Sequence, residues 1–326
     1  MSSTSKSVTA EAIRGILGIL PTPSTPDADH WSCEQSVDLD ATAAMTRMVV
    51  EGGVTLLMTG GSFGEGPSLT WREHQAFTDA IVRSHGGKAL LFVGVTTLNT
   101  RDTIERARGL IALGADGLFL GRPMWMAMDH PAIVRFYADV AEALPGVPIV
   151  VYDNEFAFKG KIATDTYREL SRNRAIIATK HIGGPTMSQD LLAVEGRMKV
   201  LPVDSQWSRF AQAHPDEATA CWTGNVADGP EPLVTLAGAV GRRDWALADR
   251  ISERMWWAQL PMFPGGKLEN FVDYNIPIAH GRLEGSGLVR SGPPRPPYLF
   301  APDGYVEGGR ETGRRWESLR REFPPG

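Results

Sequence analysis

The sequence has 326 residues, a length that suits two ordinary domains or one large α/β barrel. Its net charge of −5 and its scattered Lys and Arg residues leave no basic surface for nucleic acid. The first ten residues lack the apolar core of a signal peptide, and no stretch approaches the ~18 apolar residues that cross a bilayer, so we expect a cytoplasmic protein without a membrane partner. Cys33 and Cys221 lie far apart, which predicts neither a disulfide nor a metal site.

Eight short apolar runs recur along the chain, each with the composition of a buried β-strand. They show no alternation of polar and apolar residues, which is typical of parallel strands covered on both faces. In chain order the runs are GILGIL (15–20), VTLLMTG (54–60), ALLFVGV (89–95), DGLFLG (116–121), VPIVVYD (147–153), AIIATKHI (175–182), KVLPVD (199–204) and ATACWTGN (218–225).

Amphipathic segments separate these runs and predict helices. Examples are SVDLDATAAMTRMVVEGG, TWREHQAFTDAIVRSHGG and TRDTIERARGLIALGA, and several such segments end in glycine, as helix C-termini prefer. Eight strand–helix units that close on themselves give a (β/α)8 TIM barrel of the α/β class. A doubly wound open sheet is the alternative, but no G-x-G-x-x-G follows the first run.

The chain continues beyond the eighth unit. We expect residues 1–230 to form a catalytic barrel and residues 231–326 to form a helical region with a proline-rich tail packed on it. Residues 231–260 predict further helix, and a short last helix is expected near 308–322. The stretch SGPPRPPYLFAPDGY, from residue 291, predicts an extended segment that covers the body or a neighbouring subunit.

Lys180 lies near the end of the sixth run, and the ends of barrel strands are where catalytic residues lie. Because side chains alternate along a strand, a Lys180 that points into the barrel leaves His181 facing the helix layer. The same rule puts Tyr152 and Asn154 on one face of the fifth run and Asp153 on the other. Tyr152 and Lys180 are therefore expected at a similar height on adjacent strands.

This pair suits Schiff-base chemistry. A lysine amine removed from water loses preference for its charged form, becomes nucleophilic and condenses with a 2-oxo acid. A nearby tyrosine moves the protons that such a reaction needs. In the alternative interpretation, Lys180 extends to solvent and Tyr152 is a core aromatic residue with a satisfied hydroxyl.

Three motifs in register resemble one family. GGSFGEGPSLTWREHQAF (60–77) resembles the G-T-T-G-E signature and the Ser-Leu-Thr helix start of the dihydrodipicolinate synthase and N-acetylneuraminate lyase superfamily. VVYDN resembles its strand-five tyrosine and ATKHIGG its strand-six Schiff-base lysine. The resemblance covers approximately residues 12–290 and implies a (β/α)8 barrel.

Differences from the synthases point to one branch. Phe63 and Trp125 stand where the synthases have a threonine and a tyrosine that relay protons, and Ala157 stands where they have an arginine for the second substrate. GRPMWMAMDHPAIVRFYADVAEALP and YDNEFAFK are similar to the trans-o-hydroxybenzylidenepyruvate hydratase-aldolases of aromatic degradation. One departure is Glu155, which replaces the proline of that branch's Y-x-N-P motif.

The resemblance implies a class I, pyruvate-dependent hydratase-aldolase. Such an enzyme cleaves an aryl-substituted 2-oxo-3-enoate to an aromatic aldehyde and pyruvate, with a Schiff base on lysine and no metal or organic cofactor. The implied partner is a small 2-oxo acid, and the implied assembly is a homo-oligomer, commonly a tetramer.

The resemblance also implies roles for individual residues. Lys180 forms the Schiff base, Tyr152 moves protons and Asn154 orients the water or the new hydroxyl group. The implied binding residues are Gly61, Ser62 and Phe63 at the carboxylate, Phe63, Trp125 and Trp222 around the aryl group, and Gly183 and Asn275 as further contacts.

Strand parity also predicts a supporting pair behind the catalytic residues. Asp153 and His181 are both expected to face the helix layer on neighbouring strands, close enough to pair and so to support Tyr152 and Lys180. In the competing interpretation, each contacts water or a helix terminus instead.

The sequence leaves open the exact function, the identity of the aryl group and the residues that contact its ortho substituent. A sugar-acid lyase or dehydratase of the same superfamily would share Lys180 and Tyr152, and a non-catalytic sensor of 2-oxo acids is a further alternative. The aryl group and its ortho substituent are not determined. Arg122, His181 and Arg282 are each candidates to contact that substituent.

Overall fold

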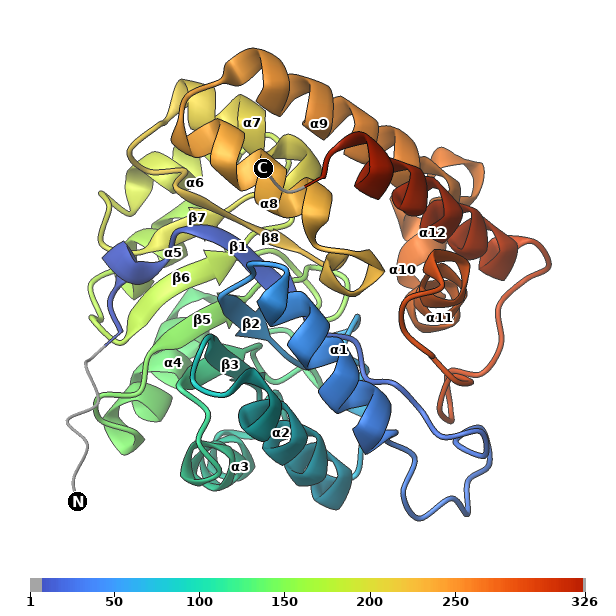
Figure 1. Ribbon diagram of the computed structural model, residues 1–326. Helices are drawn as coiled ribbons and strands as arrows, with labels where there is room; N and C mark the ends of the chain where they lie inside the picture. Colours follow the sequence, from blue (N-terminus) through green and yellow to red (C-terminus); the bar gives the residue numbers. More distant parts are fainter. Residues whose placement is uncertain (1–7, 325–326) are drawn as a thin grey trace.

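A computed structural model describes residues 8–324, and its centre is an eight-stranded parallel barrel (Figure 1). Neighbouring strands pair in the order β7-β6-β5-β4-β3-β2-β1-β8, and a parallel bridge between Val203 and Trp222 joins the two ends. All eight predicted strands are confirmed, with the bounds β1 Gly15–Ile19, β2 Leu56–Met58, β3 Leu90–Gly94, β4 Gly117–Leu120, β5 Ile149–Tyr152, β6 Ile176–Lys180, β7 Lys199–Leu201 and β8 Ala220–Thr223.

One α-helix follows each strand and covers the outside of the barrel. Local capping sets several of the helix starts: Thr70 and Glu73 form a capping box, and the Asp38 side chain accepts a hydrogen bond from the Ala41 amide. These helices are α1 Leu39–Glu51, α2 Trp71–His85, α3 Thr100–Ala112, α4 His130–Ala143, α5 Thr164–Leu170, α6 Met187–Ala193, α7 Asp204–Ala213 and α8 Glu231–Gly241.

Four more helices lie beyond the barrel: α9 Trp245–Gln259, α10 Leu268–Val272, α11 Asn275–Ser286 and α12 Tyr305–Glu322. The helix predicted over 231–260 is confirmed and consists of two helices, α8 and α9, because Arg243 adopts a left-handed φ of 59° and Asp244 caps a new helix. The last helix is longer than the short one predicted near 308–322. Short 3-10 turns span Ala10–Ala12, Gly66–Ser68, Val226–Asp228, Leu260–Met262 and Pro264–Gly266.

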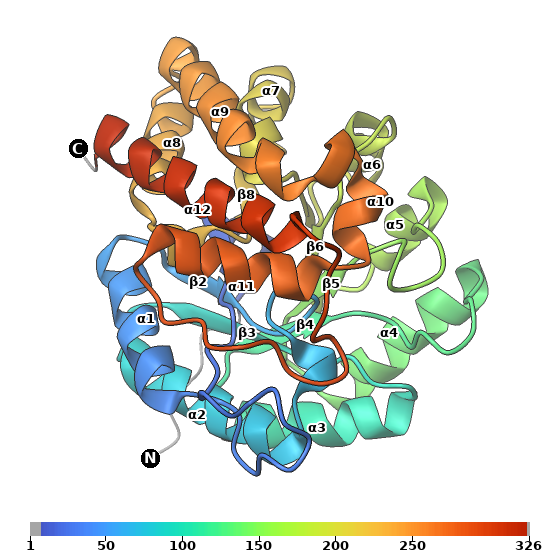
Figure 2. The same ribbon diagram turned by 90° about the vertical axis from the view of Figure 1, so that its right-hand side faces the viewer.

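Helices α11 and α12 run side by side across one end of the barrel (Figure 2). Glycines allow this close crossing: a Cβ on Gly313 would lie 2.1 Å from the Arg282 carbonyl oxygen, and one on Gly309 would lie 2.2 Å from that of Ile278. The crossing therefore fixes α11 over the ends of the strands.

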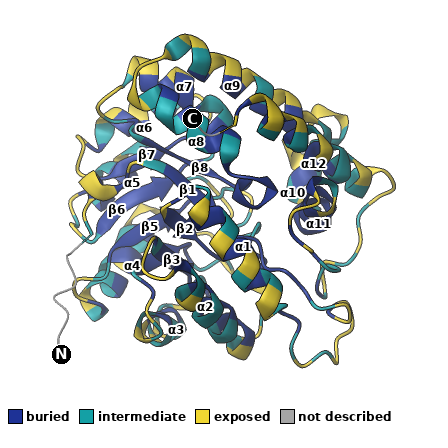
Figure 3. Cartoon of the chain, viewed as in Figure 1, coloured by how far each residue is buried: buried dark blue, intermediate teal, exposed yellow. Residues whose placement is uncertain are grey.

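Buried apolar residues fill both the inside of the barrel and the layer between strands and helices (Figure 3). Leu233 and Leu236 of α8 and Trp316 of α12 belong to the same outer core as the first seven helices. The C-terminal region thus shares its core with the barrel, and the division near residue 230 stays a prediction.

Two kinds of feature are absent from residues 8–324. No helix there is long and apolar enough to cross a membrane. That same part of the chain contains no cluster of three or more His, Cys, Asp or Glu side chains arranged to hold a metal ion. Residues 1–7, within the segment where no signal peptide is predicted, lie outside the described residues.

Candidate active site

Lys180 lies at the end of β6 with only 4% of its surface exposed, and its register partner on β5 is Tyr152. The predicted alternation is confirmed, because Tyr152 belongs to the inner core and His181 is fully buried toward the helices. Burial lowers the pKa of Lys180 to about 7, against a smaller opposing effect of the Asp153 carboxylate. A substantial fraction of the amine is therefore uncharged at neutral pH.

Trp222 of β8 lies directly against this amine. The Lys180 Nζ is 3.7 Å from the centre of the indole ring and 5.0 Å from that of the Tyr152 ring. The indole Nε1 donates a 2.7 Å hydrogen bond to the His181 carbonyl, which fixes the orientation of the ring. An aromatic face in this position favours a cation at nitrogen, whether ammonium or iminium.

The Tyr152 hydroxyl is the centre of a small polar group. It accepts a 2.9 Å hydrogen bond from Asn154 Nδ2 and lies 3.2 Å from Ser62 Oγ. Asn154 is itself oriented, because its Oδ1 accepts hydrogen bonds from the Phe156 and Ala157 amides. The hydroxyl therefore has one neighbour with which it can exchange a proton, Ser62 Oγ, and one that donates a hydrogen bond to it, Asn154 Nδ2.

The turn after β2 brings Ser62 to this hydroxyl. Gly61 adopts a φ of +63°, and a Cβ there would lie 3.1 Å from Tyr152 and 3.3 Å from Phe119, so glycine is needed for both conformation and space. The Ser62 amide points at the Tyr152 oxygen, 3.4 Å away. Backbone amides and a hydroxyl in such a turn suit a carboxylate.

A buried ionic group that sequence reasoning missed holds this turn. Glu65 Oε1 accepts a 2.6 Å hydrogen bond from His280 of α11 and lies 3.0 Å from Arg295 Nη1. Arg295 is 2% exposed and also donates to the Thr22, Pro23 and Ser36 carbonyls. The proline-rich tail therefore packs over the body of its own chain, as one of the two predicted arrangements requires. Glu65 is the last residue of the segment GSFGE (61–65), which resembles the G-T-T-G-E signature, but no local pattern identified its partners.

The predicted pair between Asp153 and His181 is wrong. Both side chains face the helix layer, as parity requires, but Asp153 accepts from Arg122 Nη1 at 3.1 Å and from the Tyr167 hydroxyl at 2.8 Å. His181 Nε2 instead contacts Asp190 of α6 at 3.0 Å. The partners come instead from elements packed behind the strands: Arg122 after β4, Tyr167 of α5 and Asp190 of α6.

Asp190 is the anionic partner of His181. Burial by itself would raise its pKa, but hydrogen bonds from His181, Thr164 and Thr186 keep that pKa below its usual value. His181 Nδ1 accepts from the Gly183 amide at 2.9 Å. His181 is therefore held from both ring nitrogens and supports the end of β6.

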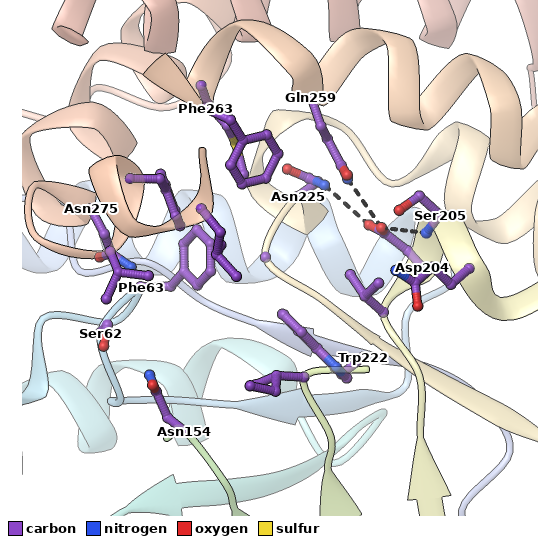
Figure 4. Close-up of a pocket in the computed structure, with 18 of the residues that line it drawn as sticks. Ser62, Phe63, Asn154, Asp204, Ser205, Trp222, Asn225, Gln259, Phe263 and Asn275 are labelled. Carbon is purple, nitrogen blue, oxygen red and sulfur yellow. Dashed lines mark hydrogen bonds between the residues drawn. The ribbon is translucent and has the colours of Figure 1, made fainter. Parts of the chain in front are cut away.

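A cavity of about 290 Å³ opens beside Lys180 at the carboxyl ends of the strands (Figure 4). It lies where barrel enzymes place their active sites. Ser62, Asn154 and Asn275 lie on one side of it and Asp204 and Ser205 on the other. Its apolar wall consists of Phe63, Phe156, Ile182, Val203, Trp222, Trp256, Leu260, Met262, Phe263, Leu268, Phe271 and Val272.

Most of the predicted site residues meet in this cavity, but some do not. Lys180, Tyr152, Ser62, Phe63, Asn154, Trp222 and Asn275 line it, and Gly61 lies directly behind Tyr152. Trp125 is 75% exposed and lies outside the lining, as does Gly183. Arg122, His181 and Arg282 are buried outside the lining and bind other groups.

Asp204, at the start of α7, is a second buried group that the sequence did not indicate. Its Oδ2 accepts hydrogen bonds from Thr223 Oγ1 at 2.6 Å and Asn225 Nδ2 at 3.0 Å. Its Oδ1 accepts from Gln259 Nε2 at 3.0 Å and from the Ser205 amide. The carboxylate therefore joins β8, α7 and α9 at the far side of the cavity.

A family comparison matches this chain over the barrel. Residues 15–201 match the model of the dihydrodipicolinate synthetase family. The chain is 43% identical to a trans-2'-carboxybenzalpyruvate hydratase-aldolase of Nocardioides sp. (strain KP7), over 98% of each chain. It is 36% identical to a trans-o-hydroxybenzylidenepyruvate hydratase-aldolase of Pseudomonas aeruginosa, over 97% of this chain and 96% of that one.

One solved structure also matches this chain over nearly its whole length. The structure of PhdJ bound to a substrate intermediate superposes with a TM-score of 0.96 at 46% identity, covering 97% of this chain and 99% of that one. The similarity therefore extends through the C-terminal helices as well as the barrel.

Proposed function

Because this chain belongs to the dihydrodipicolinate synthetase family, we propose that it is a class I hydratase-aldolase that cleaves an aryl-substituted 2-oxo-3-enoate to an aromatic aldehyde and pyruvate. The observation that carries the proposal is a buried lysine with a lowered pKa, in contact with Trp222 and Tyr152, at the base of an aromatic cavity. The relatives named above bear the names of such enzymes.

The first step joins Lys180 to the substrate. The neutral amine attacks the C2 ketone, and loss of water gives an imine that protonates to an iminium. The Gly61, Ser62 and Phe63 turn holds the substrate carboxylate through backbone amides and the Ser62 hydroxyl. The Trp222 face stabilises the positive nitrogen.

Hydration follows at the alkene. The iminium withdraws electrons from C3 and C4, so water adds at C4, the carbon that bears the aryl group, and C3 gains a proton. Asn154 donates to the Tyr152 oxygen and holds it in place. The Tyr152 oxygen takes a proton from the water and gives its own hydroxyl proton to C3, so Tyr152 ends the step neutral.

Cleavage then breaks the C3–C4 bond. Tyr152 removes the proton of the C4 hydroxyl, the C4 oxygen becomes the carbonyl of the aldehyde, and the bonding pair moves through C3 to the iminium nitrogen as an enamine. Tyr152 gives a proton to C3 of the enamine in exchange for the one it took from the hydroxyl and so returns to its neutral form. Hydrolysis of the iminium then releases pyruvate and restores the Lys180 amine. Every proton step uses water or Tyr152, so the proposed cycle needs no metal or organic cofactor.

The aromatic lining favours this substrate over a sugar acid. The Phe63 and Phe271 rings lie 5.9 Å apart and the Phe263 and Phe271 rings 5.3 Å apart, which forms a continuous aromatic wall. Such a wall offers few hydrogen bonds to a polyhydroxylated chain but good contact to a flat ring. We further propose that the enzyme acts in aromatic catabolism, assembles as a homotetramer and is located in the cytoplasm.

Borohydride trapping with pyruvate, followed by peptide mass spectrometry, tests the proposal. A reduced pyruvyl adduct on Lys180 is expected, with loss of both adduct and turnover in Lys180→Ala. Lys161→Ala is the matched control, because Lys161 is a nearby amine that contacts the Gly183 carbonyl and Thr186. A folded protein that forms no adduct would refute the proposal and favour the non-catalytic sensor.

A further inference from the structure

We propose that Arg122 and Asp153, a buried ion pair behind β5, are positioning residues for the reaction. The pair holds the loop that carries Asn154 and Phe158 against Tyr152, and it places the Asp153 carboxylate behind Lys180. This inference rests on the proposed function and adds to it two residues that do not touch the substrate.

Arg122 and Asp153 meet in the layer between the barrel and its helices, where both side chains are almost fully buried. Arg122 Nη1 donates to Asp153 Oδ1 at 3.1 Å. The other carboxylate oxygen accepts from the Tyr167 hydroxyl at 2.8 Å. Burial and the Asp153 charge raise the pKa of Tyr167, so its hydroxyl remains a donor. Hydrogen bonds to both oxygens therefore fix the carboxylate in one orientation.

The pair closes the loop that follows β5, residues 153–162. The Ile162 amide donates to Asp153 Oδ2 at 3.2 Å, which ties the two ends of the loop together. Arg122 Nη2 donates to the Gly160 carbonyl near the same end. The fork of one guanidinium therefore binds the start and the end of the loop at the same time.

This loop carries both neighbours of Tyr152. The Arg122 guanidinium lies 5.3 Å from the centre of the Phe158 ring, and that ring makes a T-shaped contact with Tyr152 at 5.2 Å. The Phe158 amide donates to the Asn154 carbonyl at 2.9 Å, so the two residues move together. The ion pair thus constrains Asn154 at the Tyr152 hydroxyl and Phe158 at its ring.

The Asp153 carboxylate also acts on Lys180. The Asp153 amide donates to the Lys180 carbonyl at 3.4 Å, which brings the carboxylate behind the amine. Its charge opposes the effect of burial on the pKa of Lys180 and so favours the protonated amine. The other titratable groups described around these two side chains are Tyr152 and Asp204 on the cavity side and Arg122, Tyr137, Tyr167, His181 and Asp190 on the helix side.

The pH dependence of trapping with pyruvate and borohydride tests the role of the charge. Asp153→Asn should lower the midpoint for Lys180 by about half a pH unit or more, because the opposing charge is gone. A loosened structure would admit water and raise the midpoint instead, so a structural role predicts the opposite sign. Asp190→Asn is the matched control, since Asp190 is a carboxylate of the same layer that binds His181, and its midpoint should stay at the wild-type value.

The double variant Arg122→Gln with Asp153→Asn repeats this test without an unpaired buried charge, and so covers the case in which Asp153→Asn alone does not fold. Its midpoint should also fall. A midpoint that stays or rises in the folded variants, or that falls equally in Asp190→Asn, would overturn the inference while the adduct on wild-type Lys180 keeps the proposed function intact. Absence of that adduct from the wild-type protein would refute the proposed function, and with it this inference.

Arg122→Lys tests the positioning role, because lysine keeps the charge but lacks the fork that binds Asp153 and Gly160 together. We expect kcat to fall by about tenfold or more, while the pyruvyl adduct forms with an unchanged pH midpoint. Arg83→Lys is the control, since Arg83 pairs with Asp79 in an exposed contact on α2. A kcat equal to that of wild type, or the same loss in both variants, would overturn the positioning role.

Discussion

Replacing Lys180 by methionine should stabilise the fold while abolishing turnover. Methionine keeps a similar unbranched length and removes the ammonium group from a site that is 4% exposed. The pKa of this lysine is lowered from its ordinary 10.5 to about 7, so folding must discharge or desolvate the amine. The structure thus predicts that Lys180, the proposed Schiff-base residue, lowers the stability of the fold.

The size of the effect follows from the pKa change. Each pKa unit corresponds to about 1.36 kcal/mol, so the full cost is about 5 kcal/mol below pH 7, about 4 kcal/mol at pH 7 and about 2 kcal/mol at pH 9. The sign is fixed because the pKa is lower in the folded state. The cost is fully present below about pH 7 and disappears as the pH rises toward 10.5.

Denaturant unfolding at pH 7, 8 and 9 measures this cost as the difference in free energy of unfolding between Lys180→Met and wild type. The exposed Lys88→Met serves as the control and should show no such pH trend. A stability gain that stays constant with pH, or a variant less stable than wild type at pH 7, would refute the desolvation of Lys180.

Three further predictions concern the Lys180 amine, the Tyr152 hydroxyl and the buried Arg295. The rate of trapping Lys180 with pyruvate and borohydride should rise with pH around a midpoint near 7, because only the neutral amine attacks. Tyr152→Phe removes the hydroxyl that lies 3.2 Å from Ser62 Oγ, and kcat should fall by about 10²–10⁴-fold in steady-state assays while the pyruvyl adduct still forms. Arg295→Met leaves Glu65 with one fewer cation and should lower the free energy of unfolding by about 3 kcal/mol in denaturant titrations.

Each of these predictions has a contrary outcome. A trapping midpoint above pH 9 would show that the amine is not desolvated. Full activity in Tyr152→Phe would move the proton transfers to another group. An Arg295→Met variant as stable as wild type would show that the tail is not held by its buried guanidinium, and Arg290→Met, which changes an exposed arginine near the start of the tail, is the matched control.

The sequence by itself determined the barrel and its reacting pair. The eight apolar runs became the eight strands, and the two-residue repeat of a strand was enough to predict that Tyr152 and Lys180 face inward at the same height. These features depend on local composition and on backbone geometry that is the same in every strand. Strand-end position then made Lys180 a candidate catalytic residue before any contact was known.

Only the tertiary structure decided which side chains meet across the molecule. Glu65 binds Arg295 across more than two hundred residues, and Trp125 turned out to be exposed instead of lining the cavity. Asp153 faces the predicted layer but contacts Tyr167 of α5 in place of His181. Strand periodicity specifies the direction of a side chain, whereas its partner depends on the length, tilt and packing of helices and tails that close over the strand from elsewhere in the chain.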